Sequence, residues 1–420
     1  MFFDPMRLSI LACNGCDAAD PMEPDMTQDL APTLAAIREA APRFVAIRRD
    51  IHAHPELGFA ETRTARIVAA QLAEWGYDVT TGIGGTGVVG RLRRGTSSRT
   101  LGLRADMDAL PIREETGLPH ASTVAGTMHA CGHDGHTAIL LAAAHHLASH
   151  GRFDGTLNVI FQPAEEGLGG ARRMIEEGLF DRFPCERVYA LHNAPGVPVG
   201  HFALRYGAMM ASSDSVTITV TGKGGHGAMP QHASDPIVAA ANIVTALQSI
   251  VARNIDPAKA AVVTVGTFHA GTAPNVIPET ATLQLSVRSL DAATRDEVEA
   301  RIRRIADAQA RAYGTVAQVD YQAISRVVVN DAAAADLAVE TITALAGAGG
   351  LTLLADGVMG SEDFSWMTER VPGCYVMLGN GLDSHGGCSV HNPGYDFNDD
   401  ALGWGAAYFV GIVERFLGTA

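Results

Sequence analysis

The segment HACGHDGH, residues 129–136, holds one thiol, three imidazoles and one carboxylate within eight residues. Thiolate, imidazole and carboxylate are the ligands that zinc and neighbouring first-row transition metals prefer. The residues that follow, TAILLAAAHHL (137–147), have the apolar pattern of a buried helix. We therefore expect a metal-binding loop that is anchored rigidly in the core by the helix it opens into.

Further candidate ligands follow segments that read as strands. These segments alternate with helical ones, which predicts a largely parallel sheet covered by helices on both faces. Ligand sites of such sheets lie outside the carboxyl ends of the strands, so residues that follow different strands can meet in one crevice. The strands and the candidate residues at or beyond their ends are TLGLRAD (100–106) with Asp106 and Asp108, TLNVIFQP (156–163) with Glu165 and Glu166, RVYALHN (187–193) with His192, and CYVMLGN (374–380) with His391.

Together, the donors outnumber the four ligands of a closed tetrahedral zinc site. The five are Cys131, His133, Glu166, His192 and His391. The surplus suggests two metal ions roughly 3.5–4 Å apart, an arrangement that activates water for hydrolysis. Other histidines and cysteines receive a structural interpretation, namely His145, His146, His150 and Cys388.

Composition limits the classes of function. The chain has 420 residues, 47% of them apolar, and a net charge of −15, so we expect two domains and neither nucleic acid nor a membrane as partner. Its six cysteines are scattered, which favours reduced thiols and a cytoplasmic location. Residues 1–26, with Cys13 and Cys16, are interpreted as a loose N-terminal extension.

The order of elements changes near residue 211. Strand, helix, strand, strand, helix and strand follow one another, which is the order of a ferredoxin-like domain. The expected strands are 215–222, 260–271, 280–290 and 316–324, and the expected helices are 235–254 and 291–314. We predict that this α+β domain, residues 211–324, is inserted into an α/β domain made of residues 27–210 and 325–420.

The chain resembles the aminoacylase/carboxypeptidase superfamily of dinuclear metallohydrolases, in the subgroup of hippurate hydrolases and plant indole-acetyl-amino-acid hydrolases. The resemblance runs from about residue 40 to the C-terminus. It implies a zinc-exopeptidase-like catalytic domain with a mostly parallel sheet and an inserted lid or dimerisation domain. The motifs are RRDIHAHPELGFAE (48–61), LRADMDALP (103–111), MHACGHDGHTA (128–138), FQPAEEGLGGA (161–171), LHNAPG (191–196), GKGGHGAMP (222–230), GTAPNVIPE (271–279), GSEDF (360–364) and HNPGYDF (391–397).

The resemblance also implies roles for single residues. Cys131, His133, Glu166, His192 and His391 would bind two divalent ions, with Zn, Mn, Ni and Co all left open. Glu165 would be the general base that activates water, and Asp108 would orient the site. By its spacing alone His226 could equally be a turn histidine between two glycines. The resemblance implies that it stabilises the oxyanion from the partner subunit of a homodimer or higher homo-oligomer, and that Asn275 binds substrate.

One departure from the wider superfamily concerns a metal ligand. Many members carry His-x-Asp where this chain has Asp106-Met107-Asp108, and a cysteine joins the ligand set here. The residue that bridges the two metals therefore stays open.

The resemblance implies a metal-dependent amidohydrolase that cleaves N-acyl-amino acids into a carboxylic acid and a free amino acid. Three other functions compete with this one. GIGGTG (82–87) fits a dinucleotide fingerprint, but VVGRLRRG (88–95) reads as a strand, so a hairpin is favoured. A purely structural metal site would be closed by four ligands and would need no spare carboxylate. A metallo-exopeptidase acting on small peptides shares the whole metal core and stays the alternative.

Overall fold

The computed structural model describes residues 30–382 and 387–418, so the predicted extension with Cys13 and Cys16 lies outside the described part. The chain divides into two compact units. The first contains the residues up to Gly207, Val329–Asp356 and the chain from Trp366 onward; the second contains Ala208–Val328 and Gly357–Ser365. The second unit thus includes a short segment that the sequence prediction assigned to the larger domain.

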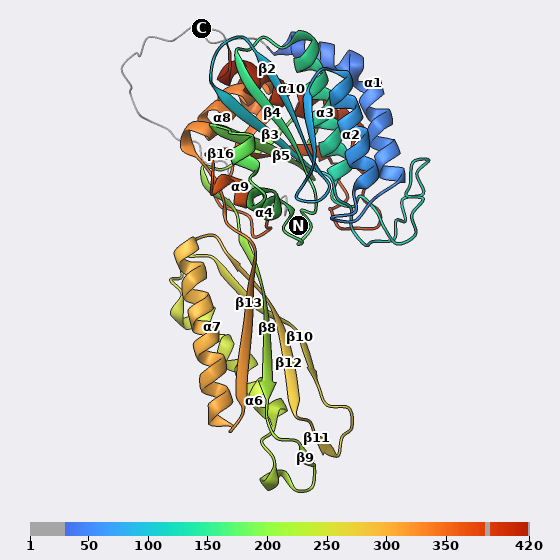
Figure 1. Ribbon diagram of the computed structural model, residues 1–420. Coiled ribbons are helices and arrows are strands. Elements are labelled where there is room, and N and C mark those ends of the chain that lie inside the picture. Colours follow the sequence, from blue (N-terminus) through green and yellow to red (C-terminus); the bar gives the residue numbers. More distant parts are fainter. Residues whose placement is uncertain (1–29, 383–386, 419–420) are drawn as a thin grey trace, which may run out of the picture. The chain divides into compact units, whose positions relative to one another are not determined.

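The first unit is built on a mixed sheet of eight strands within the described residues, in the order β1-β2-β4-β3-β5-β16-β6-β15 (Figure 1). The central strands β4, β3, β5 and β16 run parallel to one another, whereas β1, β2 and β6 each pair antiparallel with a neighbour. This arrangement confirms the mostly parallel sheet. The strands are β1 (Asp78–Ile83), β2 (Gly87–Arg94), β3 (Thr100–Asp106), β4 (Gly155–Gln162), β5 (Arg187–Pro195), β6 (Phe202–Leu204), β15 (Leu351–Leu353) and β16 (Gly373–Gly381).

The glycine-rich segment 82–87 forms the turn of the β1–β2 hairpin. Gly82, Gly84 and Gly85 have φ values of 82°, 67° and 104°, which side chains with a Cβ rarely adopt. A strand follows the turn, so no helix N-terminus is available to hold a pyrophosphate. The dinucleotide interpretation is therefore excluded.

Helices pack against this sheet, and α3 is buried along most of its length. It begins directly after Gly132, whose φ of 87° places it in the left-handed region, so the loop turns sharply into the helix. α1 and α10 pack against α3. The helical elements are α1 (Ala31–Ala53), α2 (Thr62–Glu74), α3 (His133–His150), α4 (Gly170–Glu176), α5 (Leu179–Arg182), α8 (Ala332–Ala346), η4 (Ala348–Gly350), α9 (Ser365–Thr368), η5 (Asp399–Ala401) and α10 (Leu402–Phe416).

The second unit holds a four-stranded antiparallel sheet in the order β10-β12-β8-β13. Two helices cover it, and the sequential order of the elements is that of a ferredoxin-like fold. The elements are β8 (Ser212–Thr221), β9 (Gly225–His226), η2 (Pro230–His232), α6 (Pro236–Leu247), η3 (Ile250–Asn254), β10 (Ala261–Ala270), β11 (Val276–Ile277), β12 (Thr280–Ser289), α7 (Ala292–Ala312) and β13 (Val316–Ser325). The connecting strands β7 (Gly207–Met210) and β14 (Val328–Asn330) lie where the chain passes between the units.

The predicted helix 235–254 divides into α6 and the π-helical segment η3. Asp235 caps α6, because its side chain accepts hydrogen bonds from the backbone N–H groups of Ile237 and Val238. The helical stretch Pro236–Asn254 is long and apolar enough to cross a membrane, but one such stretch is weak evidence for a membrane span. Ala239, Ala240, Ile243 and Leu247 are buried in the core of the second unit, although only 33% of the candidate span is buried.

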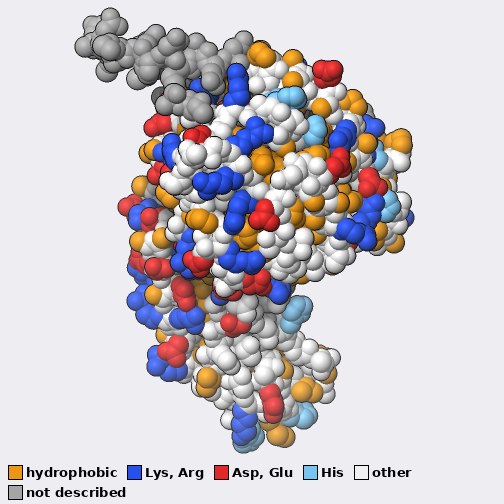
Figure 2. Space-filling model, turned by 45° about the horizontal axis from the view of Figure 1, so that its top comes forward, with side chains coloured by type: hydrophobic (Ala, Val, Ile, Leu, Met, Phe, Trp, Pro, Cys, Tyr) orange, Lys and Arg blue, Asp and Glu red, His pale blue; other side chains and the backbone are white. Residues whose placement is uncertain are grey.

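The face of the molecule shown in Figure 2 carries acidic and basic side chains that are interspersed with one another. A continuous basic surface is the feature that nucleic-acid binding requires. The charges on this face are therefore mixed, and the net charge of the chain is −15.

Candidate active site

Strand register brings the predicted site residues of the first unit to one edge of the sheet. Asp106 at the end of β3 pairs with Gln162 at the end of β4. His192 lies near the carboxyl end of β5 and pairs with Met377 of β16. The four parallel strands therefore end side by side, and the loops that leave them meet there.

All five predicted ligands and Glu165 belong to overlapping groups whose donor atoms lie within 4.8 Å of one another. Cys131 Sγ lies 3.3 Å from His192 Nε2, and Glu166 Oε1 lies 3.2 Å from His391 Nε2. The groups are Cys131 with His133 and His192, Cys131 with Glu166 and His391, and His133 with Glu165 and Glu166. The shared members make one continuous cluster.

Two buried atoms of this cluster make no hydrogen bond of acceptable geometry within the described residues, His133 Nε2 and Glu166 Oε1, although Glu166 Oε1 lies 3.2 Å from His391 Nε2. They lie 3.9 Å apart. Buried polar atoms are normally hydrogen-bonded, so an orphaned pair needs an explanation. A bound cation would satisfy both atoms, and the residues therefore fit a metal site.

The outer hydrogen bonds of two imidazoles leave the inner nitrogens free to act as ligands. His133 Nδ1 lies 3.1 Å from Asp108 Oδ1, and His192 Nδ1 lies 2.7 Å from the carbonyl oxygen of Asn193. Each Nδ1 must carry a proton to donate to such an acceptor, so each neutral ring presents the Nε2 lone pair to the cluster. Asp108 also accepts a hydrogen bond from the backbone N–H of Glu166 at 2.9 Å. It thereby orients two proposed ligands at once.

The electrostatic field of the cluster favours a cation. Burial by itself would lower the pKa of His133, but Asp106, Cys131 and Asp108 raise it well above its usual range. Burial and Glu166 raise the pKa of the Cys131 thiol. An environment that favours a proton on His133 also favours a metal ion, and metal ligation lowers the pKa of a coordinated thiol.

Asp106, the first residue of the Asp106-Met107-Asp108 stretch, belongs to a buried network of charged side chains. Asp106 Oδ2 lies 2.8 Å from Arg104 Nη1, and Asp106 Oδ1 lies 2.6 Å from His136 Nδ1. Burial alone would raise the pKa of Asp106. The charges of His133, Arg104 and His136 outweigh that effect and lower this pKa well below its usual range. The carboxylate is thus engaged in ion pairing. His136 Nε2 accepts a hydrogen bond from the backbone N–H of Asn193, beside His192.

The segment that carries His391 is held by backbone and charge contacts. His391 has a φ of 61°, a left-handed value that is uncommon outside glycine, and its N–H donates to the Ala130 carbonyl at 2.7 Å. Further along, Asp396 and Asp399 bind the buried Arg48 guanidinium at 2.8 and 2.9 Å. Arg48 also lies 3.4 Å from Asp134, the neighbour of His133. One arginine therefore joins the His391 segment to the helix that carries His133.

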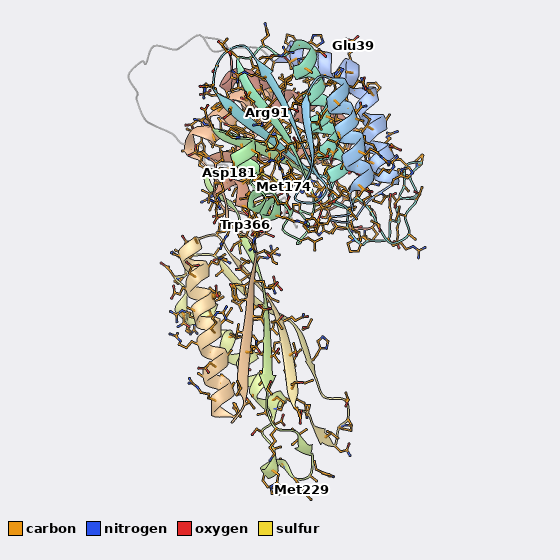
Figure 3. All side chains as sticks on the ribbon, in the orientation of Figure 1. Glu39, Arg91, Met174, Asp181, Met229 and Trp366 are labelled. Atoms are coloured by element: carbon orange, nitrogen blue, oxygen red, sulfur yellow. The ribbon has the colours of Figure 1, made fainter. Side chains whose placement is uncertain are left out.

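His226 and Asn275 lie in the second unit, where both are exposed. His226 pairs with Val276 between β9 and β11, and Gly227 N–H donates to the Asn275 carbonyl at 2.8 Å. The two residues are thus brought together. Met229, 52% exposed, marks the end of the second unit at which they lie (Figure 3).

Comparison with known proteins assigns the family. Residues 102–415 match the family described as peptidase family M20/M25/M40. Hippurate hydrolase of Campylobacter jejuni is 47% identical over 374 residues, which are 89% of this chain and 96% of the relative. The chain belongs to peptidase family M20/M25/M40.

Two other members show the range of this M20 family. Thermostable carboxypeptidase 1 of Saccharolobus solfataricus is 38% identical, and the match covers 90% of this chain and 97% of the relative. The crystal structure of the Bacillus subtilis YXEP protein, a dinuclear metal-binding peptidase from the M20 family, has a TM-score of 0.79 and 34% identity. The match covers 91% of this chain and 99% of the YXEP chain. The predicted family is therefore confirmed, and metal binding is supported.

Sequence reasoning missed the residues that hold the ligands in place. Arg104 and His136 lie inside quoted motifs but received no role, and Arg48 and Glu61 begin and end the 48–61 motif. A signal existed, because charged side chains within or next to apolar strands and helices are buried only when paired. The pairing itself could not be read from the sequence, since Arg48 and Asp399 are 351 positions apart.

Proposed function

We propose that the protein hydrolyses the amide bond of N-acyl-amino acids, releasing a carboxylic acid and a free amino acid. The convergence of five metal-binding side chains beside Glu165 carries this proposal. Two buried atoms that make no hydrogen bond, His133 Nε2 and Glu166 Oε1, support it because a bound cation would satisfy both. The hippurate hydrolase that is 47% identical supports the substrate class.

In this proposal Cys131, His133, Glu166, His192 and His391 hold two divalent ions. When bound, such ions acidify water and polarise a carbonyl. Glu165 takes a proton from the attacking water while the new C–O bond forms. It then gives that proton to the amide nitrogen as the C–N bond breaks, so one carboxylate serves as base and acid in turn. Asp108 keeps His133 and the Glu166 backbone in the required orientation.

Replacing Glu165 with glutamine tests this assignment. The Glu165→Gln variant should keep its metal content, because the five ligands remain, and kcat should fall by at least about 100-fold. Glu176→Gln, a change at an exposed carboxylate of α4, is the matched control and should keep parental kcat. Substantial turnover by a folded, metal-loaded Glu165→Gln enzyme would reject the role.

A metallo-exopeptidase is the second candidate, and the thermostable carboxypeptidase that is 38% identical favours it. Released amine should be measured for benzoyl, acetyl and indole-acetyl amino acids beside plain dipeptides. Preference for N-acyl-amino acids in kcat/KM supports the first proposal. Preference for dipeptides supports the second.

We further propose that the enzyme forms a homodimer through the second unit. Strand β10 is an edge strand of its sheet, and exposed edge strands readily pair with another chain. Exposed apolar side chains lie on β10 and on the α6–η3 segment: Ile237, Val238, Val251, Val262 and Phe268. Lysine substitutions at Val262 and Phe268 should convert the dimer to a monomer in sedimentation experiments. A parent enzyme that sediments as a monomer at micromolar concentration would refute this proposal.

His226 is proposed to stabilise the oxyanion in the partner's active site, with Asn275 nearby to bind substrate. His226 Nδ1 accepts a hydrogen bond from the Ala228 N–H at 3.0 Å, so the proton of the neutral ring lies on Nε2. That N–H is a donor of the kind that stabilises an oxyanion. Mixed dimers of His226→Ala and Glu165→Ala chains should regain activity, because one active site then has both groups. Heterodimers that form and stay inactive would exclude the trans role.

We also propose a cytoplasmic location. The four cysteines of the described part, Cys131, Cys185, Cys374 and Cys388, are free thiols, which supports a reducing compartment.

A further inference from the structure

A buried carboxylate outside the proposed ligand set contacts the backbone next to Glu165. Glu61, the last residue of the 48–61 motif, has an exposed fraction of 0%. Its Oε1 accepts a hydrogen bond from the Ala164 N–H at 2.8 Å. Its Oε2 accepts one from the Thr86 hydroxyl, which belongs to the β1–β2 hairpin. Glu61 therefore joins that hairpin to the loop that carries the proposed general base.

Ala164 has a backbone conformation that alanine disfavours. Its φ is 52°, in the left-handed region, which raises the energy of an L-residue enough to lower its population about 5–30-fold. Such strain persists only where surrounding contacts hold it. The Ala164 N–H bond to Glu61 and the Gly170 N–H bond to the Ala164 carbonyl, 3.0 Å long, are two such contacts.

The strained residue sets the direction of the two glutamates that follow it. The N–H of Ala164 is bound by Glu61, and the N–H of Glu166 is bound by Asp108 at 2.9 Å. Both carboxylates are buried. The backbone N–H groups of the residues before and after Glu165 are therefore each held by a buried carboxylate, which restricts where the Glu165 carboxylate can lie.

Close packing leaves this loop little freedom to rearrange. A Cβ on Gly58 would lie 3.0 Å from Ala164 Cβ, and a Cβ on Gly87 would lie 3.1 Å from Pro163 Cδ and 3.0 Å from Met174 Cε. Met174 belongs to α4, which follows the loop (Figure 3). The motif that ends at Glu61 and the hairpin glycine thus both pack closely against the turn.

A role in stability alone explains Glu61 poorly. Burial raises the pKa of Glu61, with the hydrogen bonds from Thr86 and Ala164 opposing that shift. A buried ionisable group costs desolvation, and an apolar side chain of similar volume often stabilises a protein as well or better. The need for a hydrogen-bond acceptor here has another explanation, because the Ala164 N–H must donate to one.

We propose that Glu61 is a positioning residue of the active site, which holds Ala164 in the left-handed conformation and thereby fixes the directions of Glu165 and Glu166. The inference rests on the proposed role of Glu165 as the general base. The energy of the strained backbone gives the expected size of the effect. Loss of the Glu61 acceptor should lower the fraction of correctly placed Glu165, and hence kcat, by up to about 5–30-fold.

The test compares two substitutions of nearly equal volume at Glu61. Glu61→Gln keeps an oxygen that accepts from Ala164 N–H, so kcat should stay within about threefold of the parent. Glu61→Met fills the space but accepts no hydrogen bond, so kcat should fall about 10-fold with little change in KM. Both are assayed at saturating metal, with metal content and the unfolding midpoint recorded. Glu61→Ala replaces the methionine variant if that chain does not fold.

A double-mutant cycle separates positioning from a general loss of structure. Glycine adopts the left-handed conformation without the penalty, so in the Ala164→Gly background Glu61→Met should cost about threefold or less. Equal costs in both backgrounds, or parental kcat in folded Glu61→Met, would overturn the proposal. If Glu165→Gln is inactive and Glu61→Met is fully active, only the positioning role fails. If Glu165→Gln is active, the proposed function fails first.

Discussion

The buried imidazole of His52 predicts how the free energy of unfolding depends on pH. The imidazole is fully buried, with Nδ1 2.9 Å from Asp134 Oδ2 and Nε2 3.3 Å from Glu114 Oε1. Burial alone would lower the pKa of His52, but Asp134 and Glu114 more than offset that effect and raise the pKa to about 9. The ring is therefore an imidazolium at neutral pH, placed between two carboxylates.

The shifted pKa fixes the sign and the size of the effect on stability. The unfolded chain has an ordinary histidine pKa of 6.5, and the folded value is higher, about 9. The stabilisation is fully present below pH 6.5 and is lost as the pH rises through 9. The difference of 9 − 6.5 = 2.5 pKa units, at 1.36 kcal/mol each, corresponds to about 3 kcal/mol.

Urea unfolding followed by tryptophan fluorescence would measure this effect. All three tryptophans, Trp75, Trp366 and Trp404, lie in the first unit, so the signal reports on the unit that contains His52. Between pH 6 and 10, at fixed saturating metal, the parent should lose about 3 kcal/mol more than a His52→Asn variant. Asparagine keeps a donor near the Nδ1 position but cannot be charged. Parallel pH curves for parent and variant would show that the imidazolium does not form.

Three further predictions concern the same unit. Arg48→Met leaves Asp134, Asp396 and Asp399 without their shared buried cation, so the same urea assay should show a loss of about 3–5 kcal/mol; a loss below 1 kcal/mol would contradict the role given to Arg48. Cys131→Ala should lose metal as well as activity, and full metal content by elemental analysis would exclude the thiolate as a ligand. Dialysis against a strong chelator should abolish hydrolysis, and adding a divalent ion should restore it; activity of the metal-free protein would refute the enzyme class.

The elements of the fold could be predicted because their patterns are local. The strand predicted at 280–290 is β12 (Thr280–Ser289), and the strand predicted at 316–324 is β13 (Val316–Ser325). The long helix predicted at 235–254 divides before residue 250, since apolar periodicity does not distinguish an α-helix from a π-helical segment. The apolar pattern at 137–147 lies within α3, which begins at His133, directly after the left-handed Gly132.

The candidate ligands could also be predicted, because their side-chain types are specific and strand ends place them together. The contacts that hold them could not, since each joins segments far apart in the chain. Arg48 meets Asp399, Glu61 meets Ala164, and Asp108 meets both His133 and the Glu166 backbone. The spacing of apolar residues within a helix or strand carries no information about such long-range contacts.

These buried charges explain how ligands on irregular loops can be placed with the precision that metal chemistry needs. His391 and Ala164 have left-handed backbones, and neither lies within a helix or strand that would fix its direction. Hydrogen bonds to a buried carboxylate or guanidinium are strong and directional, so they can supply the constraint that regular structure would otherwise provide. Burial of each charged group costs desolvation free energy, and apolar side chains of similar volume would often stabilise the fold as well or better. The charges at Glu61, Arg48 and Asp108 are therefore better explained by the geometry of the site than by the stability of the domain.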